Sequence, residues 1–237
     1  RGTDSVHIFE IGKVFSQAGE DDCLENLALG LLSAGPLGLP HWSGDPGKAC
    51  YSHLKGALES ALAALRFNAL AFKPTVHPAF DEGSAAALLY KGEQIGILGR
   101  LRNAVVEAYG ASGPVYAAEI ELGALLGKKP AVFAYEPAPK VPAVVRDLSF
   151  YIDQDAPYQD VKSAVERAAI PFLEPFDVIA RYAGPNNPPR QTSLSMRFVY
   201  RNPSATIQSE DADRSEQKIL KTLQSAFKSQ LRMGGSA

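Results

Sequence analysis

Cysteine is scarce in this chain of 237 residues, where Cys23 and Cys50 are the only two. Two cysteines are too few for a disulfide scaffold at this size, and neither stands in a spacing that binds zinc. The four histidines are scattered along the first third of the chain and are not paired with the cysteines. We therefore expect two reduced thiols in a cytoplasmic protein, and no metal site.

Long apolar runs are missing too. None approaches the roughly 20 residues that a membrane-spanning helix needs, so we expect no membrane segment. The chain opens with Arg1-Gly2-Thr3-Asp4, without the basic and apolar stretches of a secretory leader. It has no initiator Met and soon enters an apolar, strand-like segment, which leads us to expect a piece of a longer protein.

The chain also lacks the phosphate-binding motifs of common nucleotide enzymes. No Gly-Lys-Ser/Thr and no Gly-x-Gly-x-x-Gly occurs, and the glycines from Gly96 to Gly99 are more typical of strand bends than of a phosphate cradle. No nucleophile-elbow motif connects a serine with a histidine and an aspartate. We therefore expect no catalytic residues in this chain.

Strong charge of one sign is absent as well. The net charge of −2 is the balance of 24 Lys and Arg against 26 Asp and Glu. The cations favour the C-terminal half slightly, but a free-standing DNA-binding domain is usually far more basic. Any binding of RNA must therefore be local, or be shared with surfaces that are not part of this chain.

Proline marks a boundary. Residues 137–142 hold three prolines in six positions, a composition that predicts an extended, semi-rigid linker. We therefore predict two domains, residues 1–136 and residues 137–237.

The first domain mixes strands and helices. Leu54, Leu58, Leu62 and Leu65 recur with a helical period and predict the clearest helix of this half. Alternating and β-branched stretches predict the strands. The expected elements are a strand at 6–15, a helix at 51–67, two strands at 85–90 and 94–99 around a tight turn, a short helix at 105–109 and a strand at 115–122.

The second domain alternates more simply and fits the split βαβ, or ferredoxin-like, pattern. Its fold class, like that of the whole chain, is α+β. Ser209 is the expected N-cap of the last helix. The expected elements are a strand at 144–153, a helix from 157 that ends before 171, strands at 176–183 and 192–201, a long helix after Ser209 and a possible short strand at 231–233.

The strand around residues 193–201 has two different faces. Side chains alternate along a strand, so Leu194, Met196, Phe198 and Tyr200 should face the helices. The opposite face then carries serines and arginines, and the strand before it adds outward Ser149 and Tyr151. Such a surface suits phosphates and stacked bases. An ordinary solvated sheet face fits the pattern equally well.

Short segments in a fixed order resemble one known family. They run over nearly the whole chain, and their order is what makes the likeness specific. They are Phe9-Glu10-Ile11-Gly12-Lys13-Val14-Phe15, Leu54-Lys55-Gly56, His77-Pro78, Gly96-Ile97-Leu98-Gly99, Val115-Tyr116-Ala117-Ala118-Glu119, Pro142-Ala143-Val144-Val145-Arg146-Asp147-Leu148-Ser149, Tyr182-Ala183-Gly184, Thr192-Ser193-Leu194 and Leu231-Arg232. Together they resemble the C-terminal part of the β subunit of bacterial-type phenylalanyl-tRNA synthetases. Where that family has acidic residues before Leu-Lys-Gly, this chain has Cys50 and His53.

The resemblance implies an inactive class II synthetase-like module followed by a ferredoxin-fold anticodon-binding domain of βαββαβ order. It implies a cytoplasmic heterotetramer of two α and two β subunits that ligates phenylalanine to its tRNA. ATP and magnesium would then serve the α subunit, and this part would hold no cofactor. Its own contribution would be subunit assembly and binding of phenylalanine tRNA near the anticodon.

The resemblance also suggests which residues contact RNA. Tyr182 would stack on a base, and its inward or outward direction is ambiguous from the sequence. Arg146 and Asp147 are expected to pair with each other rather than with RNA. The remaining candidates are hydroxyl donors and arginines: Ser193, Ser149, Arg232, Arg190 and Arg197. The competing hypothesis is a regulatory module that binds an amino acid between paired copies, because one fold hosts many functions.

Overall fold

The structure is a computed structural model, and it describes residues 5–19, 22–39, 41–68, 70–130, 132, 135, 138–228, 230 and 231. The chain forms two compact units, Arg1–Ala134 and Tyr135–Ala237. Each unit has its own core, so each is described by itself. No helix among the described residues is long and apolar enough to cross a membrane.

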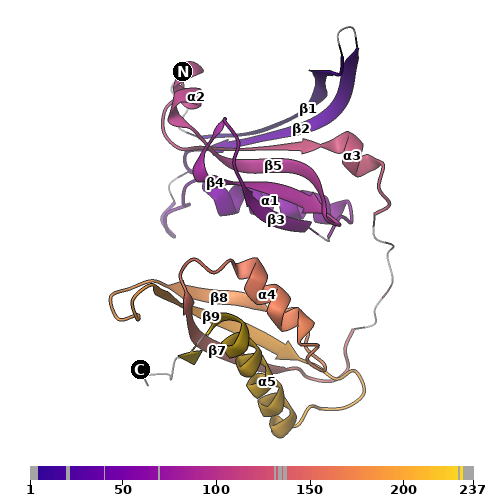
Figure 1. The fold of residues 1–237 in the computed structure, drawn as a ribbon, viewed down its shortest axis with the longest axis vertical. Helices are drawn as coiled ribbons and strands as arrows, with labels where there is room; N and C mark the ends of the chain where they lie inside the picture. Colours follow the sequence, from indigo (N-terminus) through magenta and orange to yellow (C-terminus); the bar gives the residue numbers. More distant parts are fainter. Residues whose placement is uncertain are drawn as a thin grey trace. The chain divides into compact units, whose positions relative to one another are not determined.

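The first unit is built on an antiparallel sheet of six strands in the order β1-β2-β6-β5-β4-β3 (Figure 1). A tight turn joins β4 to β5, and Lys91 and Gly92 in it both have positive φ, 51° and 88°. Such a turn matches the twist of a two-residue hairpin. The strands are β1 (Val6–Gln17), β2 (Cys23–Ala34), β3 (Leu70–Thr75), β4 (Phe80–Tyr90), β5 (Glu93–Leu101) and β6 (Val115–Glu121).

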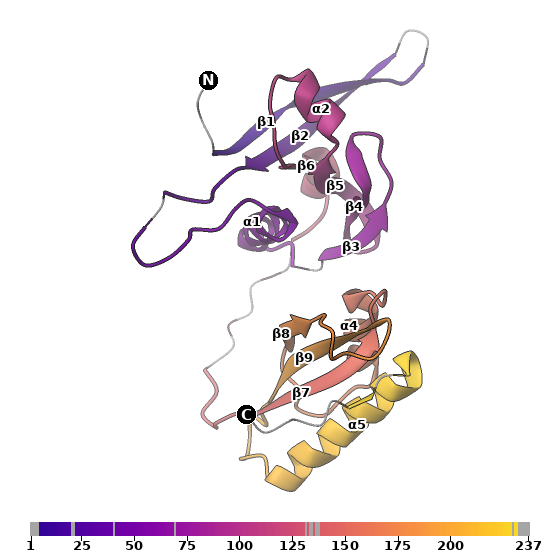
Figure 2. The same ribbon diagram turned by 90° about the vertical axis from the view of Figure 1, so that its left-hand side faces the viewer.

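One face of this sheet is covered by α1 (Tyr51–Ala64), seen end-on in Figure 2. The predicted leucine period holds, because Leu54, Leu58 and Leu62 are buried against the sheet. Leu65 is 55% exposed, since the helix ends one residue before it. Two short helices complete the unit, α2 (Asn103–Ala108) and α3 (Leu122–Leu126).

The hairpin of β1 and β2 projects beyond the rest of the sheet (Figure 1). Residues 23–27 of β2 pair with β1 alone, because β6 pairs only with Ala28–Ala34. Strand β1 is an edge, and large apolar side chains on both of its faces are exposed. Their exposed fractions are 60% for Ile8, 73% for Phe9, 57% for Ile11 and 65% for Phe15. This unit therefore exposes an apolar surface along β1.

The second unit has the predicted order βαββαβ, and its antiparallel sheet runs β10-β7-β9-β8. Both helices lie on one side of this sheet (Figure 2), which is the ferredoxin-like arrangement. The α+β class and the ferredoxin-like fold are thus confirmed. The elements are β7 (Val144–Asp153), α4 (Tyr158–Arg167), β8 (Asp177–Tyr182), β9 (Gln191–Tyr200), α5 (Ser209–Phe227) and β10 (Gln230–Leu231).

The core of the second unit lies between the sheet and the two helices. Alternate residues of β7 and β9 supply it, as the period of two predicts. Phe150, Met196 and Phe198 are fully buried, and Ile219 and Leu223 of α5 pack onto them. This one-sided core leaves the opposite side of β7, β9 and β8 uncovered by helices.

Two local predictions were wrong. Ser209 is the first residue of α5 and not its N-cap; the cap is Gln208, and it makes no side-chain capping bond. Arg146 and Asp147 do not pair with each other, because neighbours on a strand point to opposite faces. Arg146 Nη2 lies 3.3 Å from Asp213 Oδ1 of α5, whereas Asp147 pairs with Arg197 of β9.

Candidate nucleic-acid interface

The side of the second unit's sheet opposite α4 and α5 is the candidate interface, called the open face from here on. Residues directly opposite each other in an antiparallel pair share a face, so the register fixes its members. The rows across the strands are Asp147, Arg197 and Asp177; Ser149, Ser195 and Ala180; and Tyr151, Ser193 and Tyr182.

A bulge in β8 decides where Tyr182 points. Val178 lies opposite Met196 and packs into the core, and an unbroken alternation would then turn Tyr182 inward as well. The register shifts at Ile179, so Ala180 lies opposite Ser195 and Tyr182 opposite Ser193. One extra residue in a strand moves all following side chains to the other face. Tyr182 is therefore on the open face, and 43% of it is exposed.

The backbone around Tyr182 is held firmly. Its carbonyl accepts hydrogen bonds from Asn187 Nδ2 at 2.7 Å and from Thr192 Oγ1 at 3.0 Å. Its ring lies over Gly184, where an added Cβ would stand 2.1 Å from the phenol oxygen and 2.2 Å from the carbon that bears it. Only glycine at position 184 leaves room for the ring there, so the ring is presented in a defined place.

The candidate serines are less accessible than the tyrosine. The hydroxyls of Ser149 and Ser195 are 2.7 Å apart and bond to each other, and both residues are half-buried. Ser193 lies between Tyr151 and Tyr182 but is only 1% exposed. The Ser193 hydroxyl is therefore inaccessible to a ligand in this conformation, although Ser193 lies in the same row as Tyr182.

Arg197 is engaged within the open face. Its Nε donates to Asp147 Oδ1 at 2.8 Å and its Nη2 to Oδ2 at 2.7 Å, a two-pronged pair. These hydrogen bonds hold the pKa of Asp147 below its usual range. The guanidinium is half-exposed, so its outer edge remains accessible while its charge is largely balanced.

Of the two remaining candidates, Arg190 lies apart from this face. Arg190 is in the loop between β8 and β9, with φ of 59°, and its Nη2 lies 3.2 Å from Asp155 Oδ2. Both side chains of that pair are well exposed, so the pair is weak. Arg232 lies outside the described residues.

Comparison with protein-family models finds two matches. Residues 1–122 match the phenylalanyl tRNA synthetase beta chain CLM domain, and residues 139–232 match the ferredoxin-fold anticodon binding domain. The chain belongs to the phenylalanyl-tRNA synthetase β-chain family. All six candidate RNA contacts of this family member fall within the second match.

The β subunits of individual phenylalanine–tRNA ligases are similar to this chain along nearly all of its length. The β subunit of phenylalanine–tRNA ligase from Symbiobacterium thermophilum is 31% identical over 224 residues, which are 94% of this chain and 25% of that protein. The one from Clostridium acetobutylicum is 28% identical over 230 residues, 95% of this chain and 27% of that protein. The chain thus spans about a quarter of the length of the curated β subunits it matches.

Two members of the open face, Asp147 and Tyr151, were not among the predicted contacts, and neither was Thr192, which lies on the helix side of β9. Asp147 balances Arg197, and Tyr151 adds a half-buried aromatic ring to the row of Ser193. Thr192 holds the backbone of Tyr182 through its hydroxyl. Alternation already placed Tyr151 outward. The partnership of Asp147 depends on strand register, which only the pairing of β7 with β9 reveals.

Proposed function

We propose that the second unit binds phenylalanine tRNA near its anticodon through the open face, as part of a phenylalanine–tRNA ligase. The observation that carries this proposal is the exposed ring of Tyr182 on a helix-free sheet, within the segment that matches an anticodon-binding domain. Single-stranded RNA loops offer unstacked bases, and an aromatic ring on a sheet can stack on them.

The open face fits stacking better than charge attraction. Arg197 is balanced by Asp147, and the only other charged residue in the three rows is Asp177. Affinity would come from Tyr182 with a base, together with hydrogen bonds from Ser149 and the outer edge of Arg197. Ser193 would contribute after local rearrangement, and Arg190 would reach a phosphate from its loop. Arg232, next to β10, is retained as a further contact.

The first unit would serve assembly. An edge strand with exposed Phe9, Ile11 and Phe15 is a surface that soluble proteins normally cover. We propose that the ligase α subunit covers it, within an α2β2 heterotetramer in the cytoplasm. We also propose that this unit is an inactive module of the class II synthetase type.

Aminoacylation itself would take place on the α subunit, which would bind ATP, Mg²⁺ and phenylalanine. The first unit's sequence lacks the arginine-centred ATP-binding motifs of class II active sites. We therefore expect the chain alone to show no phenylalanine-dependent exchange of pyrophosphate into ATP. Exchange by the purified chain, free of α subunit, is the result that contradicts this division of labour.

A binding titration tests the function. The chain should bind phenylalanine tRNA, and the stack on the open face should itself add little to the salt dependence of the affinity, because stacking releases few counterions. Its thermal midpoint should rise with tRNA and not with phenylalanine. A midpoint that rises with phenylalanine alone would instead support the regulatory amino-acid module and overturn the RNA function.

A further inference from the structure

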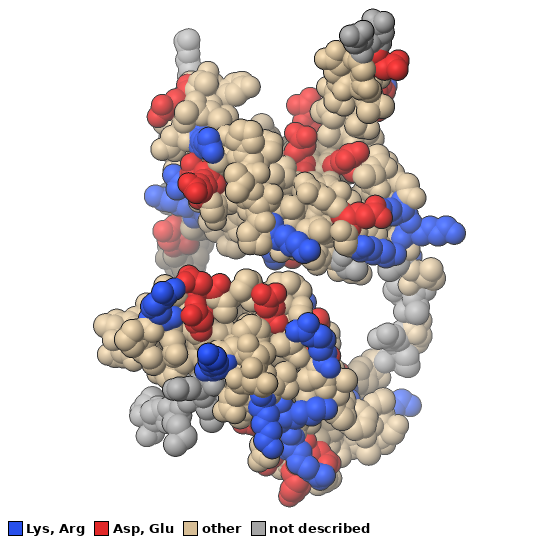
Figure 3. All heavy atoms as spheres, viewed as in Figure 1, with Lys and Arg blue, Asp and Glu red and all other residues tan. Residues whose placement is uncertain are grey.

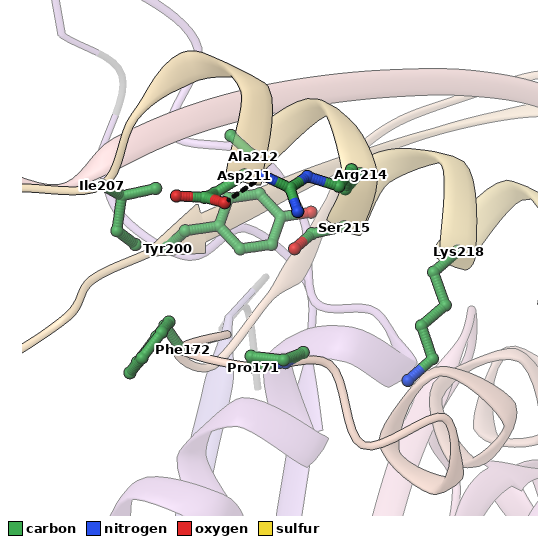
Figure 4. A pocket seen from close by; sticks show the side chains of 9 residues that line it. All are labelled: Pro171, Phe172, Tyr200, Ile207, Asp211, Ala212, Arg214, Ser215 and Lys218. Carbon is green, nitrogen blue, oxygen red and sulfur yellow. Dashed lines mark hydrogen bonds and ion pairs between the residues drawn. The ribbon is translucent and has the colours of Figure 1, made fainter.

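A pocket opens on the helix side of the second unit, on the other side of the sheet from Tyr182. It has a volume of about 420 Å³, within the size range of ligand sites. The first turns of α5 form one wall, and Pro171 and Phe172 form the opposite wall (Figure 4). Tyr200 and Ile207 complete the lining between them.

The pocket holds a buried donor that lacks an acceptor. Tyr200 is 1% exposed, yet its hydroxyl makes no hydrogen bond with any described residue. Burial, reinforced by the charge of Glu216, raises the pKa of Tyr200 to about 12. The hydroxyl is therefore protonated at neutral pH and can donate. A buried polar group is normally satisfied, so this one points to an acceptor that enters the pocket.

The wall opposite α5 is fixed in place and presents an aromatic ring. Two backbone hydrogen bonds hold it. The Phe172 carbonyl accepts from the Arg201 N–H at 2.9 Å, and the Glu174 N–H donates to the Val199 carbonyl at 2.8 Å. Phe172 has φ of 60° and is 50% exposed. A bulky residue with that φ is strained, and such strain persists where the surrounding structure holds it, often at ligand sites.

A row of cations leads away from the pocket along α5. Arg214, Lys218 and Lys221 recur every three to four residues and share one face of the helix, and Lys228 is the residue directly after its C-terminal end. In Figure 3 blue side chains gather over this part of the second unit. Arg214 is paired with Asp211 at 2.8 Å, but no ion pair of the three lysines occurs among the described residues.

We propose that this pocket and the lysines form a second RNA contact, which takes one unstacked base and the phosphates that follow it. This inference rests on the proposed function, because it assumes that the unit binds tRNA. The base lies against Phe172, and one of its carbonyl or ring-nitrogen acceptors receives the Tyr200 hydroxyl. The phosphates then follow Lys218 and Lys221 along the helix toward Lys228 just beyond its end, over roughly 15 Å.

The distribution of charge sets the direction of the strand. Glu210 and Asp211 occupy the first turn of α5, which makes that end unfavourable for phosphate. Lys218 touches the pocket and also begins the lysine row, so it is the natural point at which a base in the pocket joins its backbone. The polyanion therefore extends from the pocket toward the C-terminal end of α5.

The test compares variants of the complete ligase, assembled from α and β subunits, in binding phenylalanine tRNA at two salt concentrations. Phe172→Ala should weaken binding about 5- to 150-fold with an unchanged salt slope, since a lost stack releases no counterions. Phe172→Trp should retain binding. Lys218→Gln with Lys221→Gln should lower the salt slope by about two. The matched control is Lys162→Gln on α4, which should change neither quantity.

Tyr200→Phe separates the donor role from packing. If the hydroxyl donates to RNA, the variant binds more weakly while the free ligase is as stable as before or more stable, because an unpaired buried group has been removed. Equal affinity together with a higher thermal midpoint would mean that the hydroxyl serves no RNA acceptor, and would overturn its assignment.

The outcomes also separate this inference from the proposed function. If Tyr182→Ala weakens binding while the Phe172 and lysine variants behave as wild type, the second contact is wrong and the open face stands. If the Phe172 and lysine variants weaken binding and Tyr182→Ala does not, the pocket stands and the role of the open face is wrong. If no variant changes affinity or slope, both are wrong.

Discussion

Substitution of Gly184 provides a sharp test of Tyr182 because it moves the ring without removing it. An alanine Cβ at position 184 would lie 2.1 Å from the Tyr182 oxygen, 2.2 Å from Cζ and 2.6 Å from Cε1. Ordinary van der Waals contact is about 3.5–4.0 Å, so the ring must retreat by more than 1 Å. Nothing else lies among the closest atoms, and a half-exposed tyrosine can rotate outward at small cost.

The expected effect follows from the stack. A lost stack costs about 1–3 kcal/mol, so Gly184→Ala should weaken binding of phenylalanine tRNA by about 5- to 150-fold. Tyr182→Ala should weaken it by a similar factor. The two changes act on the same contact, so the double variant should be no weaker than Tyr182→Ala alone. Folding stability should change by less than about 1 kcal/mol in either single variant, because both sites are at the surface.

The assay is a tRNA titration of the four proteins of this cycle, with thermal unfolding as the stability control. Gly123→Ala is the matched control, because a Cβ there meets no heavy atom within 4 Å. It should bind tRNA as wild type does. If Gly184→Ala binds normally while Tyr182→Ala does not, the position of the ring over Gly184 is irrelevant. If losses from the two single variants add, they act on separate contacts, and the reasoning is refuted.

Other features predict their own outcomes. Arg190→Ala should weaken tRNA binding modestly and lower the salt slope by about one, unlike Tyr182→Ala; an unchanged slope would remove Arg190 from the interface. Arg197 lowers the pKa of Asp147, so the pair stabilises the fold above about pH 4 and this contribution is lost as pH falls through the lowered value. Asp147→Asn should therefore flatten the acid decline of the thermal midpoint only slightly, because the pair is exposed; an unchanged decline would contradict this. Hydrogen bonds from the Ser52 hydroxyl and the His53 backbone lower the pKa of Cys50 to about 7. Iodoacetamide at pH 7 should therefore alkylate Cys50 faster than it alkylates the exposed Cys23. Equal alkylation rates of the two thiols, measured by mass spectrometry, would contradict the lowered pKa.

Much of the second unit's fold can be predicted from the sequence, because the local sequence patterns in this unit are strong. Alternation in β9 predicted the buried residues Met196, Phe198 and Tyr200 correctly, since this strand has one face against helices. The long last helix was predicted as well, and Ile219 and Leu223 of α5 are fully buried. Here the residue pattern and the tertiary environment agree.

Features that depend on pairing between distant segments could not be read from the sequence. The bulge at Ile179 has no local mark, and it reverses the face on which Tyr182 lies. The contact of Asp147 with Arg197 links residues 50 positions apart and needs the register of β7 with β9. The pocket by Tyr200 likewise exists only because the loop with Phe172 is pinned beside α5.

The central claim is that the open face of the second unit holds the anticodon region of the tRNA. Ala180 is an exposed member of that face, in the row next to Tyr182, and a photo-crosslinking amino acid can replace it without removing a predicted contact. The same substitution at exposed Gln159 of α4 is the control. Irradiation of the complete ligase with phenylalanine tRNA should crosslink position 180 to nucleotides of the anticodon loop and leave position 159 unlinked. Crosslinks from position 180 to the acceptor stem, or none at all, would contradict the account.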